Sequence, residues 1–190
     1  VLRFTNFFKK LRELIINDKV GKIATIIHVE GVGNVHQSHS FVRGNWRNSD
    51  ESSPMILQKS CHDMDILQWL VDRKCTKVQS FGSLSYFNTA NKPVGSPERC
   101  IDGCPYGETC SYNSVKLYLE DEKKISFRKA ATKKPNPTNE DVEKALHETN
   151  YGKCVYNCDN NVVDHQVVNL EFEDGITASF TMSAYNKGGR

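Results

Sequence analysis

The sequence predicts an α+β fold: an open, mostly antiparallel sheet with helices packed on one face. Residues 166–182 alternate apolar and polar side chains about Asp174-Gly175, the pattern of a hairpin that buries one face of its sheet. Helical patterns occur in separate blocks between the strands, as in α+β layers. No Gly-x-Gly-x-x-Gly follows a predicted strand, so this segment is not itself a dinucleotide-binding βαβ unit.

The first part of the chain predicts a helix, a strand, a loop and a second helix. Apolar residues recur every three or four positions over residues 4–15, which indicates a helix with one apolar face. Residues 22–30 are rich in β-branched side chains and indicate a strand. Residues 31–55 are polar and Gly-containing, typical of a long irregular loop. Residues 55–72, directly after Pro54, predict one helix.

The rest of the chain predicts a strand and then an insertion. Residues 76–87 form the strand, and we expect one domain over residues 1–190 with a Cys/Pro-rich and charged insertion at about residues 88–160. Within the insertion we expect a Cys-rich excursion, a short helix, a charged mobile segment and a helix capped by Thr138: residues 88–112, 113–120, 121–138 and 139–149.

Composition and charge exclude several classes of protein. The 25 basic and 23 acidic residues give a net charge of +2, too small for the basic surface of a nucleic-acid binder. No stretch reaches the about 18 apolar residues that a membrane helix needs, and no secretory signal is visible. The chain begins at Val1 and ends just beyond a predicted strand, so we expect a fragment of a cytoplasmic protein.

The predicted helix 55–72 carries the first candidate for chemistry. His62 has Lys59 three residues before it and Asp65 three residues after it, which places all three on neighbouring helical positions. An imidazole takes or gives a proton near neutral pH, a lysine can donate a hydrogen bond to a substrate oxygen, and a carboxylate can orient the ring. The alternative is a solvent-exposed helix with an ordinary ion pair between residues three apart.

The loop that precedes this helix supplies the second candidate. It contains His36 together with four side chains that we expect to bind substrate hydroxyls or anions: His39, Arg43, Trp46 and Arg47. Trp46 could stack on the face of a sugar ring. The alternative is a polar loop whose tryptophan fills the core. His28 lies inside the first predicted strand and is interpreted as a structural or interface histidine.

Five of the seven cysteines gather in the insertion. They are spaced Cys-x3-Cys-x5-Cys and Cys-x3-Cys: Cys100, Cys104, Cys110, Cys154 and Cys158. Four thiolates suffice for a closed structural zinc site, so these residues are candidate ligands for a structural Zn²⁺. The alternative is a set of reduced cysteines that pack as small apolar side chains.

The run SSPMILQKSCHDMDILQWL adds a family resemblance. It resembles the active-site helix of the glucose–fructose oxidoreductase/inositol dehydrogenase (Gfo/Idh/MocA) family, with His62 at the position of the catalytic histidine and Asp65 at that of the following aspartate. RGNWR resembles the stretch before that helix. The N-terminal 23 residues and the closing DHQVVNLEFEDGITASFTMSAYNKGGR resemble the start and the sheet hairpin of the family's C-terminal domain.

The resemblance implies a substrate-binding and oligomerisation domain of an NAD(P)-dependent dehydrogenase that acts on a sugar, cyclitol or related polyol. His62 would exchange the hydroxyl proton during hydride transfer, and NAD or NADP would be bound mainly by the enzyme's own N-terminal Rossmann domain. The isolated fragment would then be inactive, and the full-length protein a homo-oligomer.

The sequence also departs from the family pattern. Gln58 stands where many members have the aspartate that accompanies the histidine, and Ser52, Ser53 and Pro54 replace a Gly-rich approach to the helix. Two alternatives therefore stay open: a non-catalytic oligomerisation or partner-binding domain with a structural cysteine-bound metal, and a glycosidase-like variant that recycles its NAD.

Overall fold

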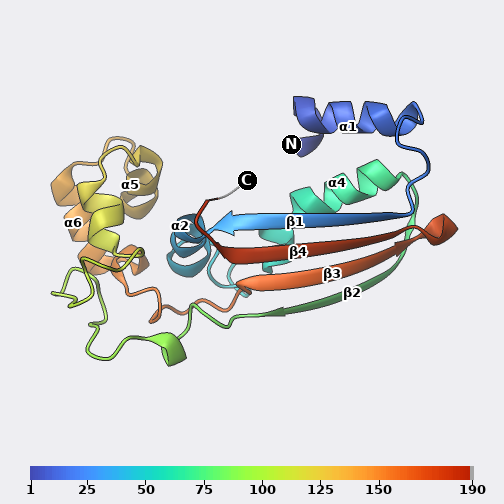
Figure 1. Ribbon diagram of the computed structural model, residues 1–190. Coiled ribbons are helices and arrows are strands. Elements are labelled where there is room, and N and C mark those ends of the chain that lie inside the picture. The colour runs from blue at the N-terminus through green and yellow to red at the C-terminus, as the bar shows by residue number, and fades with distance from the viewer. Residues whose placement is uncertain (189–190) are drawn as a thin grey trace.

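The computed structural model describes residues 1–188, and its centre is a four-stranded sheet of order β1-β4-β3-β2 (Figure 1). β1 (Thr25–Gly33) runs parallel to β4 (Thr177–Asn186). β3 (His165–Phe172) is antiparallel to both β4 and β2 (Cys75–Ser83). The predicted α+β class and the mostly antiparallel sheet are therefore confirmed.

The predicted hairpin is the β3–β4 connection. Asp174 and Gly175 have φ angles of 62° and 73°, and Phe172 N donates to Ile176 O at 2.8 Å across the turn, where residues Glu173–Gly175 form the short helix η6. The alternating apolar residues on both strands face inward, and their buried members are Val168, Leu170, Phe172, Ala178, Phe180 and Met182. A period of two residues thus places one apolar face against the helices.

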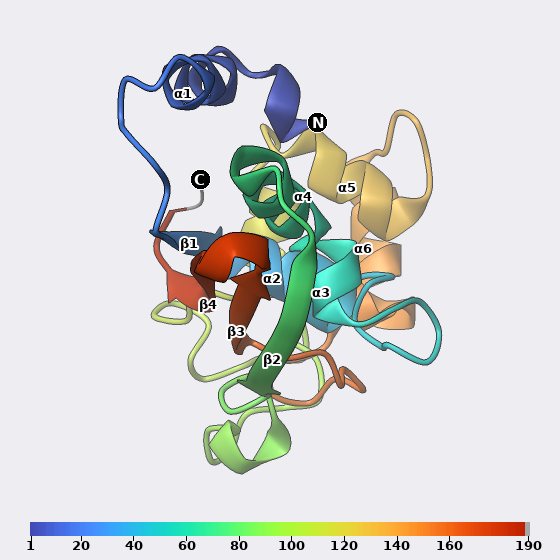
Figure 2. The same ribbon diagram turned by 90° about the vertical axis from the view of Figure 1, so that its right-hand side faces the viewer.

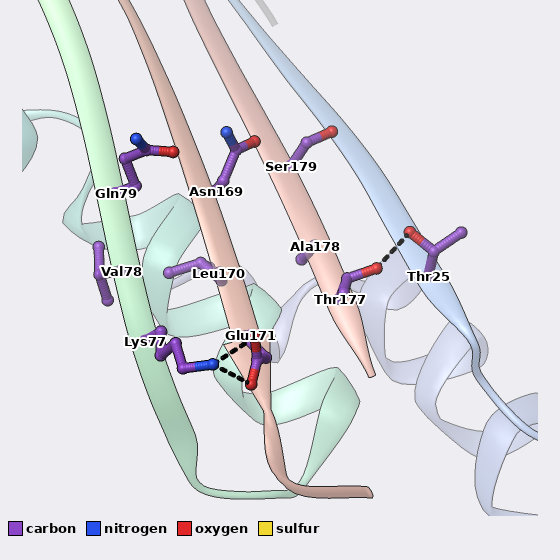
Figure 3. Close-up of a pocket in the computed structure, with 10 residues that line it drawn as sticks. All are labelled: Thr25, Lys77, Val78, Gln79, Asn169, Leu170, Glu171, Thr177, Ala178 and Ser179. Carbon is purple, nitrogen blue, oxygen red and sulfur yellow. Dashed lines mark hydrogen bonds and ion pairs between the residues drawn. The ribbon is translucent and has the colours of Figure 1, made fainter. Parts of the chain in front are cut away.

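Helices cover one face of the sheet, and the opposite face stays open. α4 (Cys61–Val71) packs on the sheet, and α1 (Asn6–Ile16), which follows the short helix η1 (Leu2–Phe4), lies outside α4 (Figures 1 and 2). Figure 3 shows the open face, with the helices behind the strands. Apolar side chains that point to this open face are exposed: Ile27, Val29, Phe81 and Val167.

The prediction of one continuous helix over residues 55–72 is wrong, because the structure has two helices there. The structure contains α3 (Met55–Gln58) and α4, separated by Lys59 and Ser60. Lys59 N still donates to Met55 O, but Ser60 has φ −84° and ψ 0°, which ends the first helix. The break coincides with the ion pair between Lys59 and Glu30 of β1, a contact between residues distant in sequence.

The predicted irregular loop 31–55 is also partly wrong, because its first half is helical. α2 (Asn34–Gln37) continues into the π-helix η2 (Ser38–Arg43) directly after β1. Phe41 and Val42 of this segment are buried in the main core. The segment is ordered because it carries apolar side chains into that core, a contribution that its polar composition conceals.

The insertion folds on a second, smaller core beyond the end of the sheet where α2 lies (Figure 1). Its helices are η3 (Thr89–Asn91), η4 (Val115–Glu120), α5 (Ile125–Thr132), α6 (Asn139–Glu148) and η5 (Asn150–Gly152). The predicted cap is confirmed: Thr138 and Asp141 form a reciprocal capping box at α6. The segment 121–138, expected to be mobile, instead contains α5, whose Ala131 is buried.

Candidate functional site

A cavity of about 460 Å³ opens at the C-terminal end of β1. Its lining comes from η1, the end of β1, α2 and the break between α3 and α4: Leu2, Glu30, Gly31, Val32, Gly33, His36 and Lys59. The three side chains in this set with ionisable groups come from three different elements. The cavity therefore gathers an acid, a base and an imidazole at one end of the sheet.

Glu30 and Lys59 form an ion pair in the wall of this cavity. The side chain of Glu30 is only 2% exposed, because even-numbered residues of β1 point toward the helices, and that of Lys59 is 19% exposed. A buried carboxylate is stable only with a compensating charge or hydrogen bonds. The pair fixes the lysine at the edge of the cavity with its ammonium group against β1.

His36 provides the imidazole of the cavity. Burial lowers the pKa of His36, the nearby positive charge of Lys59 lowers it further, and Glu30 opposes this in part. The ring lies edge-on to Phe41, with ring centroids 5.6 Å apart, and Nδ1 is 3.5 Å from Ser40 Oγ. His36 is therefore neutral at pH 7 and can both accept and donate a hydrogen bond.

His62 lies in the first turn of α4 and is half-buried. Asp65, which we expected to orient its ring, instead receives hydrogen bonds from Arg3 at 2.7 and 2.5 Å. These bonds are the main cause of the lowered pKa of Asp65, to which the charge of His62 also contributes. Asp65 is thus a fixed negative charge close to the imidazole of His62.

Asp63 and Gln58, which lie near His62 in the sequence, form hydrogen bonds with other parts of the structure. Asp63, fully buried, lies 2.8 Å from His28 Nε2 on β1, and His28 stacks on Phe180 of the core. His28 is thus a structural histidine that ties β1 to α4, as interpreted. Gln58, at the position of the family's aspartate, donates to Ser52 Oγ at 2.6 Å and to Ser53 O, so it fastens the loop before α3.

Two of the residues expected to bind substrate are interior. His39 lies 2.9 Å from the hydroxyl of Tyr118 and stacks on Phe127 with centroids 3.8 Å apart, and burial lowers its pKa to about 4. The fully buried Arg43 donates to the carbonyls of Lys153 and Tyr112, both at 2.8 Å. In this conformation both side chains join η2 to the insertion rather than line the cavity.

The other two residues of this set lie nearer the surface. Trp46 is 42% exposed. Arg47 makes two hydrogen bonds to Asp159, at 2.8 and 2.9 Å, and an ion pair to Glu51 at 3.1 Å. Among the described residues that line the β1 cavity, Lys59 is present and neither of these two is.

Glu30 is the residue of the cavity that the sequence alone did not single out. The sequence did contain a signal for the role of Glu30. This residue ends a strand of β-branched residues, and it lies two and four positions after His28 and Ile26, whose side chains face the helices. An acidic residue at an inward position of a strand is uncommon without a partner. The partner, Lys59, lies 29 residues away and could not be assigned from spacing.

Four of the five cysteines line a second, very small cavity beside Arg43: Cys100, Cys104, Cys110 and Cys154. Burial raises the pKa values of Cys110 and Cys154, and that of Cys158 to about 11, so these thiols are protonated at neutral pH. Within residues 1–188, no group of three His, Cys, Asp or Glu side chains is placed to hold a metal ion. This arrangement does not support the expected zinc site.

A family model and a curated relative both relate this chain to oxidoreductases. Residues 12–190 match the model of the oxidoreductase family's C-terminal alpha/beta domain (Gfo/Idh/MocA). The chain is 26% identical over 115 residues to "Putative oxidoreductase YteT" of Bacillus subtilis, which covers 59% of this chain and 27% of that protein. Among the helices that the structure describes, none has both the length and the apolar character to cross a membrane.

Solved structures share the fold at low identity. A "putative nadph-dependent oxidoreductase" from Desulfitobacterium hafniense is 15% identical with a TM-score of 0.51, covering 98% of this chain and 33% of that one. Scyllo-inositol dehydrogenase from Lactobacillus casei, solved with bound NAD(H) and scyllo-inositol, is 16% identical with a TM-score of 0.48, covering 96% and 34%. The chain thus spans about a third or less of the length of these relatives. The family match covers residues 12–190, which is all of the chain except its first 11 residues. This chain therefore belongs to the Gfo/Idh/MocA oxidoreductase family and corresponds to its C-terminal alpha/beta domain.

Proposed function

We propose that this chain is the substrate-binding part of an NAD(P)-dependent oxidoreductase that acts on a sugar, cyclitol or related polyol. The observation that carries the proposal is the family match over residues 12–190. The cavity at the end of β1 supports it, since its neutral imidazole and its lysine are groups that hydrogen-bond hydroxyls. One structural relative was solved with NAD(H) and scyllo-inositol.

In this proposal His62 is the proton acceptor and donor for the reacting hydroxyl. Asp65, whose carboxylate is held by Arg3, lies one helical turn from His62 on α4. Lys59 donates a hydrogen bond to a substrate oxygen at the rim of the cavity, and Glu30 keeps it there. A nicotinamide cofactor supplies the hydride acceptor when it is bound.

The described residues fit the substrate side of this reaction. The cavity offers hydroxyl-binding groups, and its two glycines, Gly31 and Gly33, are not followed by the third glycine of a Gly-x-Gly-x-x-Gly turn, because His36 stands at that position. We therefore assign the cofactor site to the enzyme's own N-terminal Rossmann domain, and we expect residues 1–190 alone to be inactive. Because all seven cysteines are free, we place the enzyme in the cytoplasm.

We also propose that the full-length protein is a homo-oligomer in which the open sheet face contacts a second copy. That face carries a hollow lined by residues of β1, β2, β3 and β4, and the ion pair of Lys77 with Glu171 lies on it at 3.0 Å (Figure 3). Ile27 on the same face is 79% exposed. A patch with both charges and apolar side chains can pair with its own copy about a two-fold axis.

The variant His62→Ala in the full-length enzyme tests the proposed function. Loss of a positioned acid–base group should lower kcat by about 10²–10⁴-fold, while NAD(H) binding, followed by nicotinamide fluorescence, is unchanged. The matched control is His147→Ala, which removes an exposed histidine of α6. Turnover by His62→Ala equal to that of the control would remove His62 from the mechanism.

A further inference from the structure

His36 lines the cavity at the end of β1 from α2, the helix that follows this strand directly. Val32 before it and Gln37 after it are fully buried, so the chain on both sides of His36 is anchored in the interior. At the start of the helix, Asn34 Oδ1 accepts a hydrogen bond from Val35 N at 2.8 Å. The backbone that carries this imidazole is therefore held in place at the cavity.

The ring of His36 is held through the part that faces its own helical segment. It packs edge-on against Phe41, whose side chain belongs to the main core, and Nδ1 lies 3.5 Å from Ser40 Oγ. Within residues 1–188, the side chain of His36 hydrogen-bonds through Nδ1, which leaves Nε2 at the tip of the ring for a ligand. A neutral imidazole carries one proton, so Nε2 either donates or accepts one hydrogen bond.

Lys59 provides a second hydrogen-bonding group from a different part of the chain. It lines the same cavity from the break between α3 and α4, and its charge is close enough to lower the pKa of His36. His62 follows Lys59 by three residues, in the first turn of α4. A substrate with several hydroxyl groups can thus direct the reacting hydroxyl toward α4 and another hydroxyl toward His36.

We propose that His36 is a specificity-determining residue, whose Nε2 forms a hydrogen bond with a hydroxyl group of the substrate other than the one that reacts. The inference rests on the proposed function, since it concerns the substrate of the same site. A polar group that loses water when substrate binds and finds no partner costs free energy, so a deoxy compound is disfavoured relative to its parent. His36 thus makes the cavity select compounds with several hydroxyl groups, and His62 keeps the role of proton acceptor.

The experiment measures the interaction between one side chain and one hydroxyl group. The full-length enzyme with NAD⁺ is assayed on scyllo-inositol and D-glucose and on monodeoxy derivatives of both. For each protein, kcat/KM, or 1/Ki where a probe only inhibits, is expressed as the ratio of parent to deoxy compound. In the wild type, this ratio should be about ten for at least one deoxy position, as expected for the loss of one hydrogen bond in a partly buried site.

The variant His36→Leu keeps an apolar contact with Phe41 and removes both ring nitrogens. It should lower kcat/KM for the parent about tenfold, mainly through KM, and leave the sensitive deoxy compound unchanged, so that the ratio falls to about one. His36→Gln places an amide group near the position of Nε2 and should keep most of the ratio. The matched control is His147→Leu, which changes an exposed histidine of α6 and should leave the ratio at its wild-type value.

Three results would overturn the inference: a wild-type enzyme that uses the parents and all their deoxy derivatives within about twofold, a ratio in His36→Leu within about twofold of the wild-type ratio, or an equal loss on parent and deoxy compounds. The last result would mean that His36 only packs against Phe41. His36→Ala gives the same comparison where His36→Leu does not fold.

These results are distinct from failure of the proposed function, which would show as normal turnover by His62→Ala. Absence of both turnover and inhibition with every probe would overturn the inference and the proposed function together.

Discussion

Substitution of Asp164 by Asn should destabilise the chain strongly, because this carboxylate organises the junction between β2 and β3. Asp164 is fully buried, and four polar hydrogens converge on it at short range. The donors are the backbone of Tyr86 at 2.7 Å, the backbone of Ser85 at 3.1 Å, the hydroxyl of Tyr185 at 2.7 Å and the ring of His165 at 2.9 Å.

The loss in free energy of unfolding depends on which carboxylate oxygen of Asp164 the amide nitrogen of Asn replaces. Oδ2 accepts from the backbone N–H groups of Tyr86 and Ser85, whereas Oδ1 serves Tyr185 and His165. An amide can replace only one of the two oxygens, and its NH₂ group would then face donors. Hydrogen bonds to a charged group contribute about 1.5–3 kcal/mol each, so the loss of two should cost about 3–6 kcal/mol.

Urea denaturation followed by tryptophan fluorescence measures this loss, with Asp102→Asn, an exposed aspartate of the insertion, as the control. The hydrogen bonds that Asp164 accepts lower its pKa, although its burial, the largest single contribution, acts in the opposite direction. Its stabilisation is therefore present above the ordinary carboxyl pKa of about 3.9 and is lost as the pH falls through the lower native pKa. A free-energy loss below 1 kcal/mol at pH 7 would refute this account.

Two further predictions concern the oligomer and the buried histidine. Val29→Lys, on the open sheet face, should shift the full-length protein toward monomers in light scattering, and an unchanged mass would exclude this face as the interface. His39 has a native pKa of about 4 against about 6.5 when unfolded, so its charging in the unfolded state should reduce stability by about 3 kcal/mol as the pH falls from 6.5 to 4. His39→Phe should remove that part of the decline in denaturation curves, and an identical pH dependence in both proteins would contradict the lowered pKa.

Sequence patterns predicted the elements whose causes are local. The β3–β4 hairpin follows from strict alternation and from the left-handed turn at Asp174-Gly175, and the start of α6 follows from Thr138 and Asp141, which lie three residues apart. Both signals act within a few residues, so a single sequence contains them completely.

The errors arise where distant contacts decide the local structure. The helix over residues 55–72 is broken at Lys59 by a partner on β1, and the helical part of the loop 31–55 is held by Arg43, whose acceptor Lys153 O is 110 residues away. The same applies to the site: Lys59 and His36 were identified by residue type, but Glu30 acquires its role only through its contact with Lys59. His39 has the composition of a binding residue and the surroundings of a core residue, with Phe127 against its ring.

The buried guanidinium of Arg43 has a practical consequence for anyone who would shorten this protein. Both of its carbonyl acceptors, on Tyr112 and Lys153, belong to the insertion, and the side chain of Arg43 is only 1% exposed. Deletion of residues 88–160 would remove both acceptors together with Tyr112 and Val155, which are part of the main core, so that apolar side chains packed against them would become exposed. We therefore expect that the rest of the chain does not fold stably without the insertion.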